Sequence, residues 1–284
     1  MKPAMSHNAY GKSNVRLVKV TREGDTHRLT ELSANVTLQG DLDATFLKGD
    51  NRLVVPTDTV KNTVYVVARQ LEFSSAEVFA LHLSKHFLDK YEHLTKADVE
   101  LTETPWNRVT VDGKAHSHAF EGGSAERRVA RVIRSREGLE LSGGVEALPI
   151  LKTTGSAFRN FHRDELTTLP DADDRLFGTV LTAHWTYAEP SPETDYNSLY
   201  SELRTKLLEV FAKHDESLAV QQTLHLMGTK ALEHSEAIKA IYLSMPNVHR
   251  LLVDLSPFGL NNPNEIFVPT DEPAGMIEAV LERA

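Results

Sequence analysis

Residues 54–63 read VVPTDTVKNT, in which two valines run into a proline and then into small polar residues. Proline fixes its own φ and has no N–H to donate. Thr57 and Asp58 would therefore present hydroxyl, carboxylate and backbone N–H groups from a constrained corner, which suits a planar ligand with hydrogen-bonding edges. The same composition is typical of an ordinary turn whose side chains bond their own backbone. These ten residues alone favour that simpler interpretation.

The first half of the chain has patterns of both strand and helix. Residues 63–68, directly after the corner, are apolar and predict a strand. Residues 31–39 alternate between apolar and polar side chains, which predicts a half-buried strand. Residues 74–77 (SSAE) resemble a capping box, and they precede Phe79, Leu83 and Phe87 at the spacing of one buried helix face. Further strands are predicted near residues 15–20, 91–102, 107–111 and 127–134, and residues 115–124 are expected to form a flexible loop.

The second half repeats this order without visible sequence identity to the first. Strands are predicted at residues 139–151, 176–187, 238–245 and 251–255, with helices after Asp195 and at residues 218–233. Each half thus contains strands, then helix, then strands, with mostly antiparallel connections. We expect an α+β protein with a first module at residues 1–137 and a second at residues 138–284.

Composition excludes several classes of function. The 284 residues carry a formal net charge of −9, which argues against a nucleic-acid partner. Because the chain has no cysteine, disulfides, thiolate metal sites and cysteine nucleophiles are excluded. The sequence shows neither an N-terminal apolar h-region, nor a run long enough for a membrane span, nor a Ser-Lys-Leu ending. A cytoplasmic protein without membrane contact is therefore expected.

Common cofactor and metal signatures are also absent. The sequence has no Gly-x-Gly-x-x-Gly, Walker or Gly-x-Ser-x-Gly motif. His82 and His86 are spaced four apart on a predicted helix, and a solvated face is the simpler explanation of this pair. His116 and His118 flank a serine in the expected loop. No metal site is predicted.

Three other stretches carry candidate binding groups. Asn247 and His249 follow Pro246 at a strand end, where a simple turn is about equally favoured. Val220 and Gln221 begin a helix, whose free N–H groups favour an anion, although a solvent-facing glutamine is the plainer alternative. Arg175 could clamp a planar anion and Phe158 or Phe161 could stack on a ring, against the alternatives of a surface ion pair and core packing.

Together these stretches resemble the urate oxidase (uricase) family in the same order along nearly the whole chain. The matching segments are residues 10–12 (YGK), 56–63, 151–158, 163–164, 167–169, 174–175, 220–221, 246–249 and 257–267. The resemblance implies two tandem tunnelling-fold (T-fold) modules, each an antiparallel sheet with helices on one side. It also implies a homotetramer around a central tunnel, with active sites at subunit interfaces.

The resemblance further implies roles for individual residues. Phe158, Arg175, Val220, Gln221 and Asn247 correspond to the family's urate-binding residues of one subunit. Thr57 and Asp58 correspond to residues that the neighbouring subunit contributes. Lys12, Thr57 and His249 resemble the family's proton relay. The implied reaction oxidises urate with dioxygen and water to 5-hydroxyisourate and hydrogen peroxide, without cofactor or metal.

Two alternatives remain open at this level. A pterin-handling enzyme of the same fold would normally have a zinc site or an acidic ring-anchoring residue, and the Lys12, Thr57 and His249 set would have no evident role in it. A non-catalytic purine-binding relative would be favoured if a relay residue were missing, and none is missing.

Overall fold

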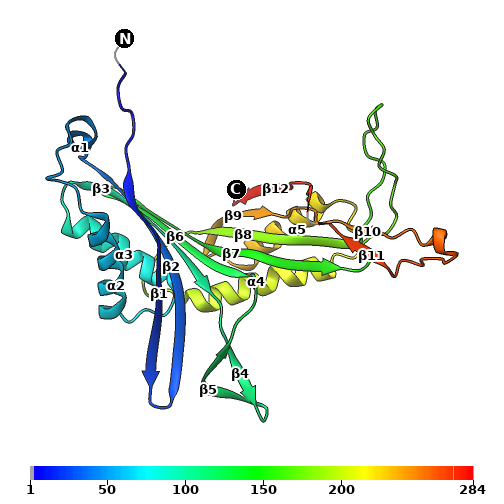
Figure 1. Cartoon of the computed structure of the whole chain (residues 1–284), viewed down its shortest axis with the longest axis horizontal. Coiled ribbons are helices and arrows are strands. Elements are labelled where there is room, and N and C mark those ends of the chain that lie inside the picture. Colours follow the sequence, from blue (N-terminus) through cyan, green and yellow to red (C-terminus); the bar gives the residue numbers. More distant parts are fainter. Residues whose placement is uncertain (1–2, 271, 284) are drawn as a thin grey trace. The chain divides into compact units, whose positions relative to one another are not determined.

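The computed structural model describes residues 3–270 and 272–283, which pack as two compact units (Figure 1). The first unit comprises the described residues up to Gly144 together with Thr186–Tyr200. The second comprises Val145–Trp185 and the described residues from Ser201 onward. This packing division does not test the module boundary expected at residue 138, which stays a prediction.

The first unit is a sheet with two main helices on one face (Figure 1). Its strands pair antiparallel in the order β1, β2, β3, β6. The strands are β1 (Tyr10–Glu23), β2 (Thr26–Gly40), β3 (Leu94–Thr104) and β6 (Arg127–Ser135), and the helices are α1 (Asp43–Lys48), α2 (Thr57–Gln70) and α3 (Ala76–Lys90). The alternation expected at residues 31–39 is confirmed, because Leu32, Ala34, Val36 and Leu38 are all buried.

The strand expected at residues 63–68 is wrong, because these residues lie inside helix α2. Val60, Val64 and Val67 are buried and follow helical spacing, whereas Val66 is 49% exposed. The β-branched composition favours a strand only weakly, and packing of a helical face against the sheet overrides it. The constrained corner is therefore a helix N-terminus, with Pro56 at the N-cap.

The start of α3 differs in detail from a capping box. Ser75 is the N-cap, and its Oγ accepts a hydrogen bond from the Val78 N–H at 3.3 Å. Glu77 does not return to the cap; it is fully buried, and its Oε2 accepts from Arg128 Nη2 at 2.7 Å. The helix and its buried Phe79, Leu83 and Phe87 face are confirmed.

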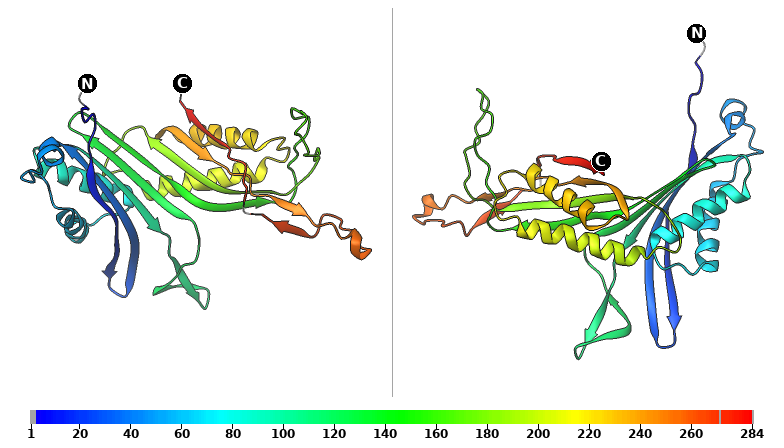
Figure 2. Two further views of the ribbon diagram at one scale, coloured as in Figure 1. Left: turned by 45° about the horizontal axis from the view of Figure 1, so that its top comes forward. Right: turned by 180° about the vertical axis from the view of Figure 1, so that it is seen from behind.

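The flexible loop expected at residues 115–124 is largely a strand. Strands β4 (Asn107–Val111) and β5 (Lys114–Glu121) form a hairpin that projects from the first unit (Figure 2). Asp112 and Gly113 both have positive φ at its turn, as a tight hairpin connection requires. The polar side chains of β5 concealed its strand character because the ribbon has little core to face.

The second half of the chain repeats the order of the first half, so the fold is two tandem T-fold modules. Its sheet has the order β7, β8, β9, β12, and two helices lie along one face (Figure 2). The elements are β7 (Leu139–Lys152), β8 (Phe177–Tyr187), α4 (Tyr196–Lys213), α5 (Val220–His234), β9 (Ile238–Ser244), β10 (Arg250–Leu252), η1 (Ser256–Phe258), β11 (Phe267–Pro269) and β12 (Glu278–Glu282). In both halves, two strands, two main helices, a strand, a two-stranded ribbon and a last strand follow in sequence, and the first half has the short helix α1 in addition.

The end of the second module differs from expectation. The segment at residues 251–255 does not close the sheet, because β10 pairs with β11 instead. Strand β12, which the sequence patterns did not indicate, pairs antiparallel with β9 and forms the sheet edge.

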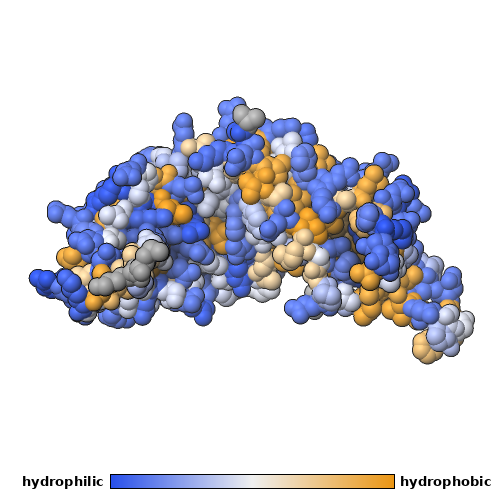
Figure 3. Space-filling model, turned by 90° about the horizontal axis from the view of Figure 1, so that it is seen from above, coloured by the Kyte–Doolittle hydropathy of each residue, from blue (hydrophilic) through white to orange (hydrophobic). Residues whose placement is uncertain are grey.

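Apolar side chains are exposed on the ribbon of the second unit and the segment that joins its strands. Leu251, Leu252, Phe258, Leu260 and Val268 are all exposed. Figure 3 shows orange apolar surface on the right-hand side, where β10 and β11 lie in Figure 1. Within residues 3–270 and 272–283, no helix is both long enough and apolar enough to cross a membrane.

Candidate functional site

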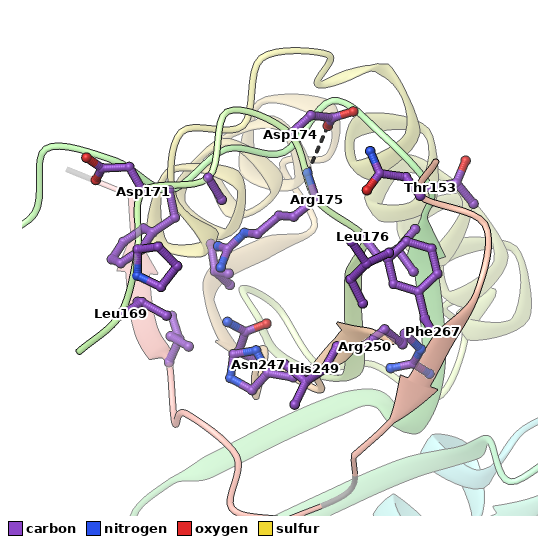
Figure 4. A pocket seen from close by; sticks show the side chains of 18 of the residues that line it. Thr153, Leu169, Asp171, Asp174, Arg175, Leu176, Asn247, His249, Arg250 and Phe267 are labelled. Carbon is purple, nitrogen blue, oxygen red and sulfur yellow. Dashed lines mark hydrogen bonds between the residues drawn. The ribbon is translucent and has the colours of Figure 1, made fainter. Parts of the chain in front are cut away.

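The second unit contains a cavity of about 610 Å³ near the ends of β8, α5 and β9 (Figure 4). Its lining includes six of the candidates that the sequence assigned to the second module: Phe158, Arg175, Val220, Gln221, Asn247 and His249. These residues come from segments up to 91 positions apart in the sequence, and folding brings them around one space.

Arg175 is a half-buried cation that lines the cavity. Its side chain points into the space on the side where Asn247 and His249 lie (Figure 4). Burial lowers the pKa of its guanidinium, and no carboxylate in the described part of the chain forms an ion pair with it. A half-buried cation without a counter-ion has lost hydration that no partner replaces, so the cavity favours an anionic ligand.

The nearby carboxylates all have other partners. Asp173 pairs with Arg159 at 2.6 Å, and Asp171 pairs with Arg163 at 3.0 Å. Asp174 Oδ2 accepts from Thr154 Oγ1 at 2.6 Å, which lowers the pKa of the Asp174 carboxyl. Its Oδ1 accepts the Arg175 backbone N–H at 3.0 Å (Figure 4). Asp174 thus bonds the Arg175 backbone, and the guanidinium has no carboxylate partner in the part of the chain that the structure describes.

Phe158 provides an aromatic wall of the cavity. The Arg175 guanidinium lies 5.2 Å from the centroid of its ring. The Phe161 ring stacks on Phe158 with centroids 4.9 Å apart, and Phe161 is not among the lining residues. Of the two phenylalanines, Phe158 is therefore the one whose ring faces the cavity.

Helix α5 directs its N-terminus at the cavity. Val220 and Gln221 occupy its first two positions. The next two N–H groups, of Gln222 and Thr223, donate to Ala219 O at 3.1 and 3.3 Å. Those of Val220 and Gln221 form no hydrogen bond within the described residues, so both are available to a ligand.

The Asn247–His249 segment is held by its backbone. The Asn247 N–H donates to Gly275 O at 2.8 Å, and the Val248 N–H donates to Gly178 O at 3.0 Å. His249 O accepts from the Thr270 N–H at 3.0 Å. Within the described residues, the side chains of Asn247 and His249 form no hydrogen bond, so they can contact a ligand in the cavity.

Lys12, Thr57 and Asp58 form a second cluster, in the first unit. The Val55 N–H donates to Tyr10 Oη at 2.8 Å, which ties the start of β1 to the segment before α2. Hydrogen bonding by Lys61 lowers the pKa of Asp58, with a smaller contribution from the Lys12 charge. The structure therefore groups the candidates in two sets, one in each unit.

Local backbone geometry explains the YGK sequence at residues 10–12. A Cβ at Gly11 would lie only 1.8 Å from Val36 O, so no side chain fits there. The β1–β2 register shifts between Lys12 and Val15. Asn14 has a φ of 55° in this bulge, and its N–H donates to Asn35 Oδ1 at 2.8 Å. Such bulges re-aim side chains, here next to Lys12.

Sequence reasoning missed one cationic lining residue, Arg250. Its Nη1 donates to Val248 O at 2.9 Å, and a Cβ at position 178 would lie 2.8 Å from the same nitrogen. The glycine at 178 was the available signal, because a strand glycine often marks a close approach.

Comparison with known proteins decides the family. A family model described as Uricase matches residues 8–133 and 141–278. The chain belongs to the uricase family. The uricase of Arthrobacter globiformis is 41% identical over 99% of this chain and 91% of its own length. The uricase of Schizosaccharomyces pombe is 38% identical, covering 97% of this chain and 96% of that protein.

The fold is that of solved uricases. The crystal structure of the Arthrobacter globiformis uricase superposes with a TM-score of 0.94, covering 100% of this chain and 96% of the other. Uricases are oxidoreductases, and the similarity extends across both modules, so the whole chain shares the family's architecture.

Proposed function

We propose that this protein is a urate oxidase. It oxidises urate with dioxygen and water to 5-hydroxyisourate and hydrogen peroxide. The observation that carries this proposal is the half-buried Arg175, which has no ion-pair partner among the described residues and lies beside the Phe158 ring, in a cavity that Asn247 and His249 also line. Urate is a planar anion, and this combination offers a cation, a stacking face and directional polar groups.

The binding roles follow from these groups. Arg175 supplies a positive fork that grips an edge of the urate ring. The side-chain amide of Gln221 bonds an acceptor and a donor on the neighbouring edge of the ring, and the Val220 N–H donates to the same edge. Phe158 covers one face of the ring, and Asn247 frames a place for dioxygen and then water on the opposite face.

The proposed chemistry needs a proton to leave urate before electrons pass to dioxygen. His249, Thr57 and Lys12 form the relay that accepts and moves this proton. One urate, one dioxygen and one water then give one 5-hydroxyisourate and one hydrogen peroxide. The two electrons come from the urate ring, so the reaction as proposed needs neither metal nor flavin.

We further propose that each site is shared between subunits of a homotetramer built around a central tunnel, in the cytoplasm. Thr57, Asp58 and Lys12 lie in one unit, and the other candidates lie in the second unit. A neighbouring copy would complete the site by bringing its first unit to this cavity. The free N–H groups at the start of α2 would then bond the ligand, with Asp58 contributing its backbone N–H.

The test is the loss of urate's ultraviolet absorbance with purified, metal-stripped protein in air. We expect the band to disappear with release of equimolar hydrogen peroxide. Tight urate binding without turnover would instead support a purine-binding protein. Neither binding nor turnover would redirect attention to a pterin enzyme and an assay for zinc.

A further inference from the structure

A chain of hydrogen bonds through the buried hydroxyl groups of Thr223 and Ser217 links the two segments that carry the ligand-facing edges of the cavity. Thr223, in the first turn of α5, is fully buried, and Ser217 is 1% exposed. Their hydroxyl oxygens are 2.7 Å apart. His214 Nδ1 is 2.9 Å from Thr223 Oγ1, and Ser217 Oγ is 3.3 Å from Ala219 O. Neither hydroxyl lines the cavity itself.

The direction of this chain follows from counting protons. Ala219 O can only accept, so the Ser217 hydroxyl donates to it. The Thr223 hydroxyl must then donate to Ser217, and His214 must donate to Thr223 through an Nδ1–H. Burial and the nearby Lys152 charge lower the pKa of His214, which favours a neutral ring with a single N–H. Each of the three contacts then has its own proton.

One end of the chain orients the α5 N-terminus. Ala219 O is also the acceptor for the Gln222 and Thr223 N–H groups. The Ser217 hydroxyl therefore adds to the bonds that fix the first turn of the helix. This turn carries the Val220 and Gln221 N–H groups that face the cavity.

The backbone of Ser217 holds the opposite edge. The Ala157 N–H donates to Ser217 O at 2.8 Å, and the Ser217 N–H donates to Gly155 O at 3.1 Å. Gly155 has a φ of 74°, and a Cβ there would lie 2.8 Å from Asp215 O. Ser156 O in turn accepts the Arg175 N–H at 2.8 Å. Ser217 thus connects the segment that bears Phe158 and Arg175 to helix α5.

We propose that Thr223 and Ser217 are positioning residues that set the spacing between the two edges of the urate site. The proposal rests on the proposed function. The hydroxyl contact joins the Phe158 and Arg175 edge to the Val220 and Gln221 edge, and it acts on ligand affinity without touching the ligand. Since both edges bind substrate and transition state alike, loss of the contact raises KM more than it lowers kcat.

The test compares Thr223→Val, Thr223→Ser and the control Thr229→Val in the full-length protein. Valine keeps the shape of threonine but leaves His214 Nδ1–H and Ser217 Oγ without their partner. We expect Thr223→Val to raise the KM for urate about tenfold with kcat changed less than about twofold. Thr223→Ser, which restores the hydroxyl, should return KM to near the wild-type value. Thr229→Val makes the same change on the same helix outside the hydroxyl chain, and it should have no effect.

A second measurement makes the result independent of turnover. Backbone hydrogen exchange of peptides covering residues 155–158 should quicken in Thr223→Val, while peptides of β2 keep their rate. An active enzyme whose KM and exchange are unchanged by Thr223→Val would overturn the positioning role, as would equal effects of Thr229→Val. Absence of urate turnover in the wild type would overturn the proposed function alone, and exchange would still decide the role of Thr223.

Discussion

Two partly buried arginines, Arg128 and Arg175, differ in whether they have a partner. Arg128 Nη2 meets Glu77 at 2.7 Å, and Glu103 lies 4.0 Å from Arg128 Nε. Arg175 is desolvated without any such partner among the described residues. Removing one member of a buried ion pair leaves the other charge uncompensated, whereas a partly buried charge without a partner can gain one from a ligand.

The first prediction tests the free guanidinium. Arg175→Lys keeps the charge but loses the planar two-pronged donor. We expect the KM for urate to rise by roughly a hundredfold, which corresponds to about 2.7 kcal/mol. Steady-state kinetics on urate would measure this. Arg159→Lys is the matched control, because Arg159 forms an exposed pair with Asp173. Similar kinetics in the two variants would contradict the role of Arg175.

The second prediction concerns Glu103, whose pKa is raised, mainly by burial. Folding therefore favours its protonated form. The resulting stabilisation is complete below the unfolded pKa of about 4.3 and is lost as pH rises through the folded pKa. Glu103→Gln should then raise the free energy of unfolding at pH 8 relative to wild type, with little difference near pH 4.

Denaturant unfolding at both pH values would measure this effect. Glu100→Gln on the same strand is the control, because Glu100 is exposed. A Glu103→Gln variant that is less stable than wild type at pH 8 would show instead that attraction to Arg128 outweighs burial.

At the scale of elements, α2 has a valine-rich composition that is typical of a strand, yet it folds as a helix. Its N-terminus presents Thr57 and Asp58, while Val60, Val64 and Val67 attach it to the sheet. The N–H groups in the first turn of a helix have no partner within the helix, so they can bond a ligand. The element's type therefore bears directly on what the first unit can bind.

The third prediction distinguishes helix from strand at α2. Val64 and Val66 would share a face in a strand, but Val64 is buried and Val66 is exposed. Val64→Ala should lower the free energy of unfolding by roughly 1–3 kcal/mol, and Val66→Ala should change it by less than about 0.5 kcal/mol. Chemical denaturation measures both. Equal losses would favour the strand.

At the scale of the whole molecule, the residues of the proposed site lie in both units. The cavity belongs to the second unit, and Lys12 and Thr57 belong to the first. The exposed apolar side chains of β10 and β11, such as Leu251 and Val268, suit contact with another copy. Assembly would cover these side chains and complete the site together.

The fourth prediction tests this sharing by complementation. Lys12→Met and Arg175→Ala should each abolish most turnover alone. Co-expressed, they should recover about one quarter of wild-type activity, because random pairing restores one intact site in four. Urate consumption by the mixed protein measures the recovery. No recovery from a mixed oligomer would mean that each site comes from a single chain.

Short-range patterns in the sequence determined where several helices and strands of this protein lie. Alternation located β2, and helical spacing located α3 and α5, because both signals arise from neighbours along the chain. The six cavity residues were all named from local composition and family resemblance. Tertiary structure decided the rest. The valines of α2 form a helix because a sheet face is available to bury them. Glu77 pairs with Arg128, 51 positions away, and does not bond the helix cap. Among the described residues, Arg175 has no ion-pair partner, because Thr154, Arg159 and Arg163 bond the neighbouring carboxylates. Such choices depend on which groups folding brings together, and spacing along the chain does not record them.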